Sequence, residues 1–444
     1  MTVCQRIDRS INMEWNDLER DVPKWFERSK LGIFIHWGAY SVAGWAEPTA
    51  KLGEIPDDEG WFGHNPYAEW YYNSIRIPNS PAYEHHQEVW GGKPYDVLLD
   101  EWKAEKFDAQ ELVDLFRDVG ANYLVLTTKH HDGITLWDAP GTGDRNTVSR
   151  GPKQDLVDAY VKAARKSGMR FGAYYSGGLD WWFRPFPAHL TGESLNNTDR
   201  PKDAEYAAYA LDHLQDLVDR YQPDMLWNDI NWPDAGKELN TPYALGNFFA
   251  KYYAACPEGV VNDRWRVPHA DFVTSEYMAD LENESKGIWE NCRGLGLSFG
   301  YNQVETLDHA MSPEEILTTL VDFAARGGRL LLGVGPKADG TLPQWQVDLL
   351  LAIKPWMKEF GELLSGISRA GNAEVSTESW HQVAQGDDGD YLFIEKPADG
   401  DEVKVTLQQP LTSVSSEWAT VTEGDGCKII KFNNKVGPAV FKIG

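Results

Sequence analysis

Histidines, carboxylates, an arginine and aromatic side chains recur in this sequence directly after short apolar runs. The polar segments that end these runs are His36, His130-His131-Asp132, Tyr174-Tyr175-Ser176, Trp227-Asn228-Asp229, Asn262-Asp263-Arg264, Thr274-Ser275-Glu276-Tyr277 and Phe299-Gly300-Tyr301. If the runs are parallel strands of a barrel, these segments meet at the carboxyl ends of the strands, where barrel enzymes place their catalytic groups. Each residue alone has an ordinary structural explanation, but the whole set predicts an active site.

Two kinds of chemistry could use this set. A metal-dependent hydrolase would bind a divalent cation through His36, His130 or His131, together with Asp132 or Asp229. The sequence contains no H-x-H or HExxH pattern, and neighbouring residues on a strand point to opposite faces, so His130 and His131 are not expected to share one metal ion. The other chemistry is glycoside hydrolysis by two carboxylates, with His, Arg and Trp side chains holding a neutral sugar. We favour the second chemistry, and expect neither a metal ion nor another cofactor.

Composition agrees with a neutral sugar ligand. The 444 residues include 42 basic and 68 acidic side chains, for a formal net charge of −26. This charge argues against a nucleic acid or an anionic membrane as partner, because binding phosphate groups requires a basic patch. The chain also has 19 Trp, 19 Tyr and 17 Phe, and flat aromatic rings are the surfaces on which sugars stack. No apolar stretch is long enough to predict a transmembrane helix.

The elements that would position these residues are short apolar runs, mostly continuous rather than alternating. Such runs are typical of parallel strands that are buried on both faces. The predicted strands are residues 31–36, 123–128, 170–175, 225–227, 260–262, 272–276, 297–301 and 329–334. Helical patterns lie between several of them, over 108–118, 154–166 and 203–221. Ser312 and Glu315 form a capping-box pattern before a further helix over 316–325.

Strands with intervening helices predict an α/β fold of the (β/α)8 TIM-like type. The interval from Asn262 to Phe272 is too short for a helix, so we expect an irregular barrel. A doubly wound open sheet is the alternative, but no G-x-G-x-x-G motif follows the first strand. After a last amphipathic helix over 343–364, alternating residues and turn signals predict a small antiparallel β-sandwich. The predicted domains are a catalytic barrel over residues 1–362 and a C-terminal β-sandwich over 363–444.

The cysteines indicate the compartment. Cys4, Cys256, Cys292 and Cys427 lie far apart and match no metal or disulfide spacing, so we interpret them as free thiols of a reducing environment. Residues 1–15 contain no apolar core of a secretory signal. These features predict a cytoplasmic protein, acting on short oligosaccharides imported into a bacterial cell.

At the polar segments the chain resembles the α-L-fucosidases, the retaining enzymes of glycoside hydrolase family 29. The resemblance runs in order over residues 24–340. It is carried by G-I-F-I-H-W-G at 32–38, P-Y-A-E-W-Y at 66–71, T-K-H-H-D-G at 128–133, Y-Y-S at 174–176, W-N-D at 227–229, N-D-R-W at 262–265 and G-L-S-F-G-Y-N at 296–302. The family resemblance implies an irregular barrel followed by a C-terminal β-sandwich, in agreement with the pattern of strands and helices.

The resemblance also implies a role for each matched residue. Asp229 falls at the position of the nucleophile, and Glu276 at that of the acid/base in bacterial relatives. Glu69 is a competing candidate for the acid/base. Asp263 is a further possibility, although its position beside Arg264 is interpreted more simply as that of the arginine's partner. The residues implied to bind the substrate are His36, Glu69, Trp70, His130, His131, Tyr174, Trp227, Arg264 and Phe299, the last against the methyl group of fucose.

The implied function is that of a retaining exo-α-L-fucosidase, which removes terminal α-L-fucosyl residues through a covalent fucosyl-enzyme. The implied partner is a fucosylated oligosaccharide, with no nucleic acid and no membrane. An inactive, carbohydrate-binding barrel would keep the aromatic residues but lose a carboxylate at Asp229 or Glu276, and both are present. Another exo-glycosidase on the same scaffold is the nearer alternative.

Overall fold

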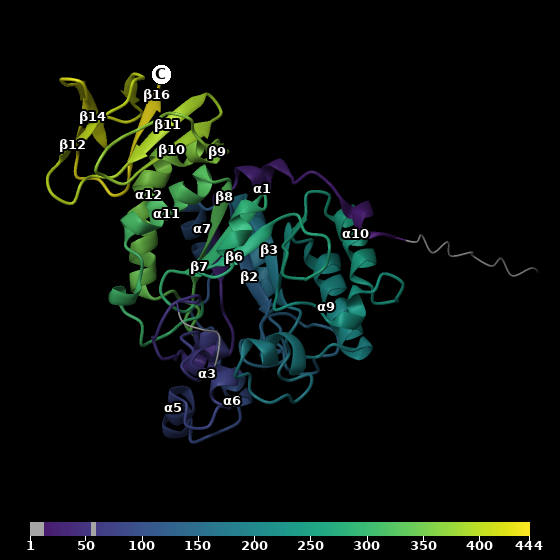
Figure 1. Cartoon of the computed structure of the whole chain (residues 1–444). Helices are drawn as coiled ribbons and strands as arrows, with labels where there is room; N and C mark the ends of the chain where they lie inside the picture. The colour runs from purple at the N-terminus through teal and green to yellow at the C-terminus, as the bar shows by residue number, and fades with distance from the viewer. Residues whose placement is uncertain (1–12, 55–58) are drawn as a thin grey trace, which may run out of the picture.

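An eight-stranded parallel sheet lies at the centre of the computed structural model, which describes residues 13–54 and 59–444 (Figure 1). The strands are β1 Leu31–Ile35, β2 Tyr123–Lys129, β3 Arg170–Ser176, β4 Met225–Asp229, β5 Val260–Val261, β6 Val273–Glu276, β7 Trp289–Gly294 and β8 Gly328–Val334. Their order is β5-β4-β3-β2-β1-β8-β7-β6, so that β1 pairs with both β2 and β8. The sheet curls into an incomplete barrel, and almost every strand residue is buried, as continuous apolar runs predict.

The barrel is irregular between β5 and β6, where the described strands share no backbone ladder. Aspartate side chains join them instead. The carboxylate of Asp271 accepts the Val261 N–H at 2.7 Å, and the Asp271 N–H donates to the Val261 carbonyl at 2.9 Å. On the other side, Asp263 accepts both the N–H and the hydroxyl of Thr274, at 3.1 and 2.8 Å. The predicted irregularity is therefore confirmed, and it falls at the short link between residues 262 and 272.

One predicted strand is wrong. Residues 297–301 form a loop, and the seventh strand is the preceding segment, β7. β7 contains Glu290 and Asn291, both fully buried, and their polarity hid the strand in the sequence. The backbone of the loop does not pair with a neighbouring strand. Instead, two of its N–H groups donate to the carboxylate of Glu305, at 3.1 and 2.7 Å.

The helices predicted around the barrel are confirmed, and local caps explain where they begin. The side chains of Asp108, Asp155 and Asp203 each accept backbone N–H groups of the first turn of their helices. Ser312 and Glu315 form the predicted capping box. The helices are α1 Lys24–Arg28, α2 Tyr40–Ala43, α3 Glu59–Gly63, α4 Tyr71–Ser74, α5 Pro81–Trp90, α6 Asp96–Glu101, α7 Ala109–Asp118, α8 Leu156–Ser167, α9 Ala204–Tyr221, α10 Leu245–Ala255, α11 Pro313–Ala325 and α12 Gln344–Ser365. Within the described ranges, none has the length and apolarity needed to cross a membrane.

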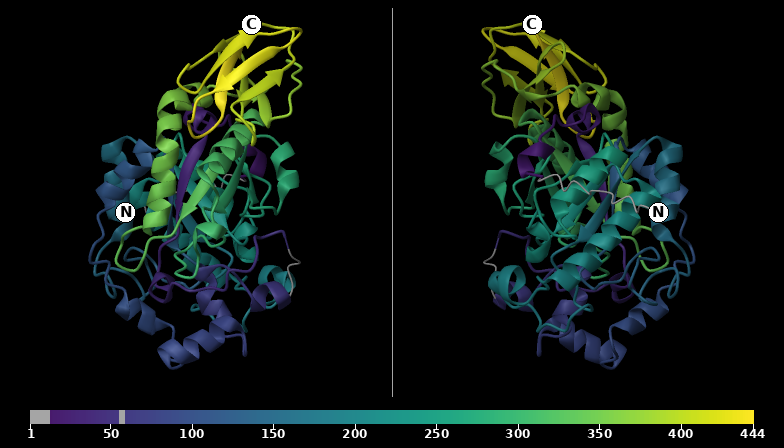
Figure 2. Two further views of the ribbon diagram at one scale, coloured as in Figure 1. Left: turned by 90° about the vertical axis from the view of Figure 1, so that its left-hand side faces the viewer. Right: turned by 90° about the vertical axis from the view of Figure 1, so that its right-hand side faces the viewer.

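Two antiparallel sheets follow α12. One has the order β13-β16-β11-β10-β9 and the other β12-β15-β14. Their strands are β9 Arg369–Ala370, β10 His381–Gly386, β11 Gly389–Ile394, β12 Glu402–Val405, β13 Leu411–Ser413, β14 Ala419–Glu423, β15 Lys428–Phe432 and β16 Ala439–Ile443. Figure 2 shows these sheets in yellow at the end of the barrel where α1 lies, and Arg28 of α1 forms an ion pair of 2.9 Å with Asp387. Helices α3, α5 and α6, from the long β1–β2 connection, lie at the opposite end (Figure 1).

Candidate active site

All the residues that sequence analysis assigned to the site line one cavity at the carboxyl ends of the barrel strands. They are His36, Glu69, Trp70, His130, His131, Tyr174, Trp227, Asp229, Arg264, Glu276 and Phe299. Sequence analysis missed three further lining residues, Phe34, Tyr67 and Cys292. Tyr67 stands two residues before Glu69 in a segment already matched to the family, which was the one available signal for it.

Strand ends bring most of these side chains together. Tyr174 lies on β3, Asp229 ends β4 and Glu276 ends β6, while Glu69 comes from a 3-10 turn, Ala68–Trp70, in the β1–β2 connection. His130 and His131 follow the end of β2 and both line the cavity, with ring centroids 4.0 Å apart. The expectation that they point to opposite sides is wrong, because the alternation of a strand does not extend beyond its last residue.

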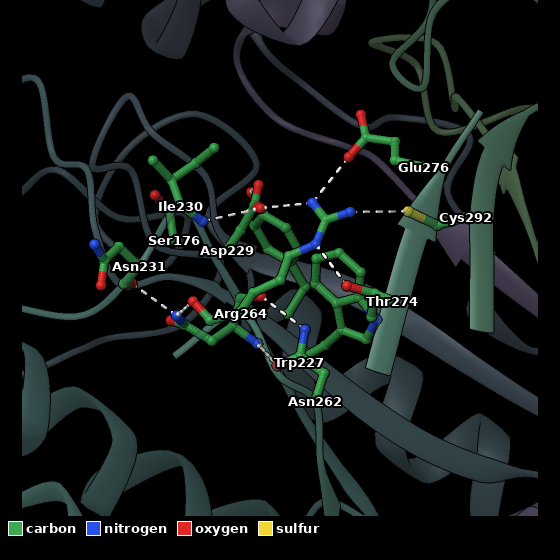
Figure 3. A network of polar contacts seen from close by, with 12 residues as sticks. Ser176, Trp227, Asp229, Ile230, Asn231, Asn262, Arg264, Thr274, Glu276 and Cys292 are labelled. Carbon is green, nitrogen blue, oxygen red and sulfur yellow. Dashed lines mark hydrogen bonds and ion pairs between the residues drawn. The ribbon is translucent and has the colours of Figure 1, made fainter. Parts of the chain in front are cut away.

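A single arginine nitrogen contacts both candidate catalytic carboxylates (Figure 3). Nη1 of Arg264 lies 2.9 Å from Oδ1 of Asp229 and 2.8 Å from Oε2 of Glu276. The two carboxyl oxygens are therefore less than about 6 Å apart, the close spacing of a retaining rather than an inverting glycosidase. The guanidinium also lies over the ring of Trp227, 4.6 Å from its centroid. The arginine is therefore held by this ring as well as by the two carboxylates.

Asp229 is fixed by several donors besides the arginine. The hydroxyl of Tyr174 donates to its Oδ2 at 2.8 Å, and the N–H of Ile230 donates to its Oδ1 at 3.0 Å. These contacts stabilise an ionised carboxylate and hold it in one orientation, as a nucleophile requires.

Glu276 has the surroundings of a proton donor. Burial raises the pKa of its carboxyl, and the nearby charge of Asp229 adds to the increase, while Arg264 and a hydrogen bond from the Tyr67 hydroxyl oppose it. Two carboxyls whose environments separate their protonation are the usual arrangement of a glycosidase. The surroundings of Glu276 therefore favour the protonated form that a general acid needs.

Glu69 is more deeply buried and is committed to a loop. Its Oε2 accepts the Gly300 N–H at 2.8 Å and the Ser298 hydroxyl at 3.1 Å. Burial raises the pKa of Glu69 to about 7. It ties the β1–β2 connection to the loop that carries Phe299, and its carboxyl faces the same cavity.

The histidines of the site are neutral. Burial lowers the pKa of His36, His130 and His131 well below the usual value, and in each case nearby positive or imidazole groups lower it further. The hydroxyl of Ser176 donates to the Leu179 carbonyl, so it accepts the proton of His131 Nδ1 at 2.6 Å and leaves Nε2 as an acceptor. Within the described residues, Nδ1 of His36 and of His130 is buried without a partner. Neutral imidazoles of this kind suit the hydroxyl groups of a sugar.

A second group of buried polar residues lies beneath the site. Glu290 accepts Trp227 Nε1 at 2.8 Å with one oxygen and the Tyr123 hydroxyl with the other. The indole N–H of Trp227 therefore points into the barrel core and not toward a ligand. Cys292 lies 3.6 Å from Arg264, and burial raises the pKa of its thiol well above the usual value, so it is not a thiolate nucleophile.

Contrary to expectation, the side chain of Asp263 does not contact that of Arg264. It binds Thr274, whose hydroxyl oxygen in turn accepts Arg264 Nε at 3.0 Å. The structure thus separates Asp263 from the reacting groups and gives it a part in joining β5 to β6.

A wider cavity of about 470 Å³ opens outside the first. Asp229, Arg264 and Glu276 line both. Glu69 lines only the inner one. The two carboxylates thus stand at the boundary between an inner, aromatic-walled cavity and an outer one.

Comparison with known proteins agrees with this geometry. A family model for alpha-L-fucosidase matches residues 2–362. The alpha-L-fucosidase of Dictyostelium discoideum is 30% identical over 399 residues, which are 87% of this chain and 81% of that protein. Human tissue alpha-L-fucosidase is 29% identical over 425 residues, 92% of this chain and 83% of that protein.

A solved structure is more similar still. Thermotoga maritima alpha-fucosidase in complex with fucose superposes with a TM-score of 0.85 at 41% identity, covering 97% of this chain and 99% of that one. The match spans both the barrel and the C-terminal sheets. The chain therefore belongs to the alpha-L-fucosidase family and is a glycoside hydrolase.

Proposed function

We propose that this fucosidase acts on terminal α-L-fucosyl residues with retention of configuration, with Asp229 as nucleophile and Glu276 as acid/base. The observation that carries the proposal is the contact of both carboxylates with one nitrogen of Arg264, at 2.9 and 2.8 Å. This spacing leaves no room for a water molecule between carboxylate and sugar, which an inverting enzyme needs. A relative of 41% identity that holds fucose supports the choice of sugar.

Glu276 is favoured over Glu69 as acid/base by its position. The proton must reach the oxygen that joins the fucose to its leaving group, and that oxygen lies where the inner cavity meets the outer. Glu276 lines both cavities, whereas Glu69 lines only the inner one. Glu69 is better placed to bind a hydroxyl group of the sugar while it holds the loop at Gly300.

The reaction follows in two steps. A carboxylate oxygen of Asp229 attacks the anomeric carbon as the bond to the leaving oxygen breaks, and Glu276 gives its proton to that oxygen. This forms a covalent β-fucosyl ester. Glu276, now ionised, removes a proton from water, which attacks the same carbon and releases α-L-fucose and the free Asp229 carboxylate. Arg264 and the neutral histidines form hydrogen bonds with groups of the bound sugar and the nucleophile. These hydrogen bonds strengthen in the oxocarbenium-like transition state.

The sugar specificity is tested by comparing aryl α-L-fucosides with aryl galactosides and xylosides. Roles are tested with variants. Asp229→Gly should lower turnover about a thousandfold or more even with good leaving groups, and azide should rescue it to give the inverted β-fucosyl azide. Glu276→Ala should spare the first step for an activated aryl fucoside, with azide giving the retained α-azide. Near-normal turnover of Asp229→Gly would refute the nucleophile.

We further infer that residues 1–362 and 363–444 are separate domains and that the two C-terminal sheets pack as a β-sandwich. Apolar residues of both sheets, among them Phe393 and Ile430, are buried in the same cluster, which also extends into the barrel. We also propose a cytoplasmic location in a bacterial cell. The cysteines Cys256, Cys292 and Cys427 are unpaired, as in a reducing compartment. Activity found mainly in culture medium without lysis would contradict that location.

A further inference from the structure

The outer cavity is the space into which the leaving group of the substrate extends. It adjoins Asp229 and Glu276, and its volume of about 470 Å³ is that of a cavity for a sugar-sized ligand. The inner cavity, walled by His36, Tyr174 and Phe299, has a volume of only about 30 Å³, so a fucosyl group that contacts these walls also fills the adjoining part of the outer cavity. This division rests on the proposed function, in which the bond that breaks lies between the two carboxylates.

The lining of the outer cavity combines apolar with polar side chains, and one buried amide in it has a donor without a partner. Trp61, Phe62 and Leu195 are buried and line it. Asn65 also lines it and is only 5% exposed. Its Oδ1 accepts the Tyr67 N–H at 2.8 Å, which fixes the amide, and its Nδ2 has no partner within the described part of the chain.

Arg266 is the cation of this cavity that has no anionic partner. It is exposed, lines the cavity, and forms no ion pair or side-chain hydrogen bond with any residue that the structure describes. Its backbone is in the left-handed region, with φ of 54°, and its N–H donates to the Asp263 carbonyl at 3.1 Å. Arg264, two residues earlier, is by contrast held between Asp229 and Glu276.

Two further cations, Arg200 and Lys237, lie outside the lining of the cavity, and Lys237 is close enough to feel the charge of Arg266. Arg200 and Lys237 share one carboxylate, that of Asp234, at 2.7 and 3.3 Å. Burial lowers the pKa of Lys237, and the charges of Arg200 and Arg266 lower it further, against the effect of Asp234. The lining of the cavity has Arg264 and Arg266 against Asp229, Glu276 and Asp280. Because Arg264 is already paired with Asp229 and Glu276, Arg266 is the lining arginine that is available to an anionic ligand.

We propose that the outer cavity binds a leaving-group sugar that carries a negatively charged substituent, a carboxylate or a sulfate ester, and that Arg266 selects it. Arginine matches the planar or branched oxygen groups of both substituents. Asp280, on the same cavity lining, acts in the opposite direction and favours neutral leaving groups. The ratio of kcat/KM for an anionic over a neutral leaving group is therefore set by these two residues.

The test uses three fucosides that share the same fucosyl group, linked to galactose, to galactose sulfate and to a uronic acid. The ratio of kcat/KM for each charged fucoside over the neutral one is measured in the full-length enzyme. In Arg266→Asn, whose side chain tolerates the left-handed backbone, the ratio should fall about tenfold, the usual value of one hydrogen bond to a charged group. Arg266→Lys should keep most of the ratio, and Asp280→Asn should raise it.

Salt provides a readout that needs no variant. In the unmodified enzyme the ratio should fall as ionic strength rises, because exposed charges are screened, whereas in Arg266→Asn it should not fall and should rise slightly, because the repulsion from Asp280 is then screened. A ratio below one in the unmodified enzyme, or one that is equal in Arg266→Asn and insensitive to salt, would overturn the inference while leaving fucoside hydrolysis intact. Failure to cleave any of the three, or an aryl fucoside, would instead contradict the proposed function.

Discussion

The hydroxyl of Tyr67 donates a hydrogen bond of 2.9 Å to Oε1 of Glu276, and so joins the β1–β2 connection to the end of β6. Burial raises the pKa of the Glu276 carboxyl, and this hydrogen bond opposes the increase because it stabilises the ionised form. The protonation of the candidate acid is thus adjusted by a residue from a distant part of the chain.

Replacing Tyr67 with Phe should move the alkaline limb of the pH profile of kcat/KM to higher pH by about one unit, since a donor to the ionised carboxylate is lost. Hydrolysis of an aryl α-L-fucoside across the pH range measures this. Tyr277→Phe is the matched control, because Tyr277 stacks beside Tyr67 but donates to backbone carbonyls. An unmoved limb in Tyr67→Phe would argue against Glu276 as the acid.

Replacing Glu69 with Gln should lower kcat/KM by a similar factor for all fucosides. The amide keeps an oxygen for the Gly300 N–H and the Ser298 hydroxyl, so the loop holds, but a contact to the sugar changes. We expect kcat/KM to fall by about tenfold to a hundredfold without dependence on the acidity of the leaving group. Glu276→Gln should instead slow poor leaving groups most. If Glu69→Gln shows that dependence and azide rescue, the two assignments are reversed.

Replacing Glu290 with Leu should disturb the active site through the buried residues that support it. It would leave Trp227 Nε1 and the Tyr123 hydroxyl buried without their acceptor, and Trp227 supports Arg264. We expect a loss of stability of about 2–3 kcal/mol and a fall in kcat/KM with a changed pH profile. Glu290→Gln, which keeps one acceptor, should retain most activity. Tyr123→Phe removes only one of the donors and separates the two effects.

Glu305 should make stability depend on pH. Burial raises its pKa from 4.5 to about 8, so in the folded protein it holds a proton that the unfolded chain has lost. Its contribution to stability is complete below the unfolded pKa and is lost as pH rises towards 8, by about 1.4 kcal/mol per pH unit. Glu305→Gln should therefore match the unmodified protein at pH 4 and exceed it in denaturant unfolding at pH 7. Exposed Glu101→Gln should show no such divergence.

Local sequence signals predicted much of the fold. Apolar runs marked seven of the barrel strands, because strands buried on both faces need continuous apolar residues. Caps such as Asp203 and Ser312 marked helix starts, because their acceptors satisfy free N–H groups nearby in the chain. The position of polar residues after strands then brought Asp229 and Glu276 to one cavity.

Sequence analysis missed features whose hydrogen-bond partners come from distant segments of the chain. β7 was missed because it contains two buried polar residues with distant partners. Glu290 accepts Trp227 Nε1, and Asn291, on the opposite face of the strand, donates to the Ser275 hydroxyl. A polar residue with a distant buried partner has no local signal that separates it from a surface residue. The contact of Tyr67 with Glu276 was hidden for the same reason.

The join between β5 and β6 lies between two parts of the site. The sequence of one part can change without loss of strand pairing, and the other part is held in place by the sheet. Asp229 stands on β4, which has a backbone ladder on both sides. Arg266 and Asp280 come from segments beside the join, where Asp263 and Asp271 hold the strands through side chains. Loops beside such a join can gain or lose residues without breaking a ladder. Relatives can therefore evolve new leaving-group preferences there while the nucleophile keeps its place.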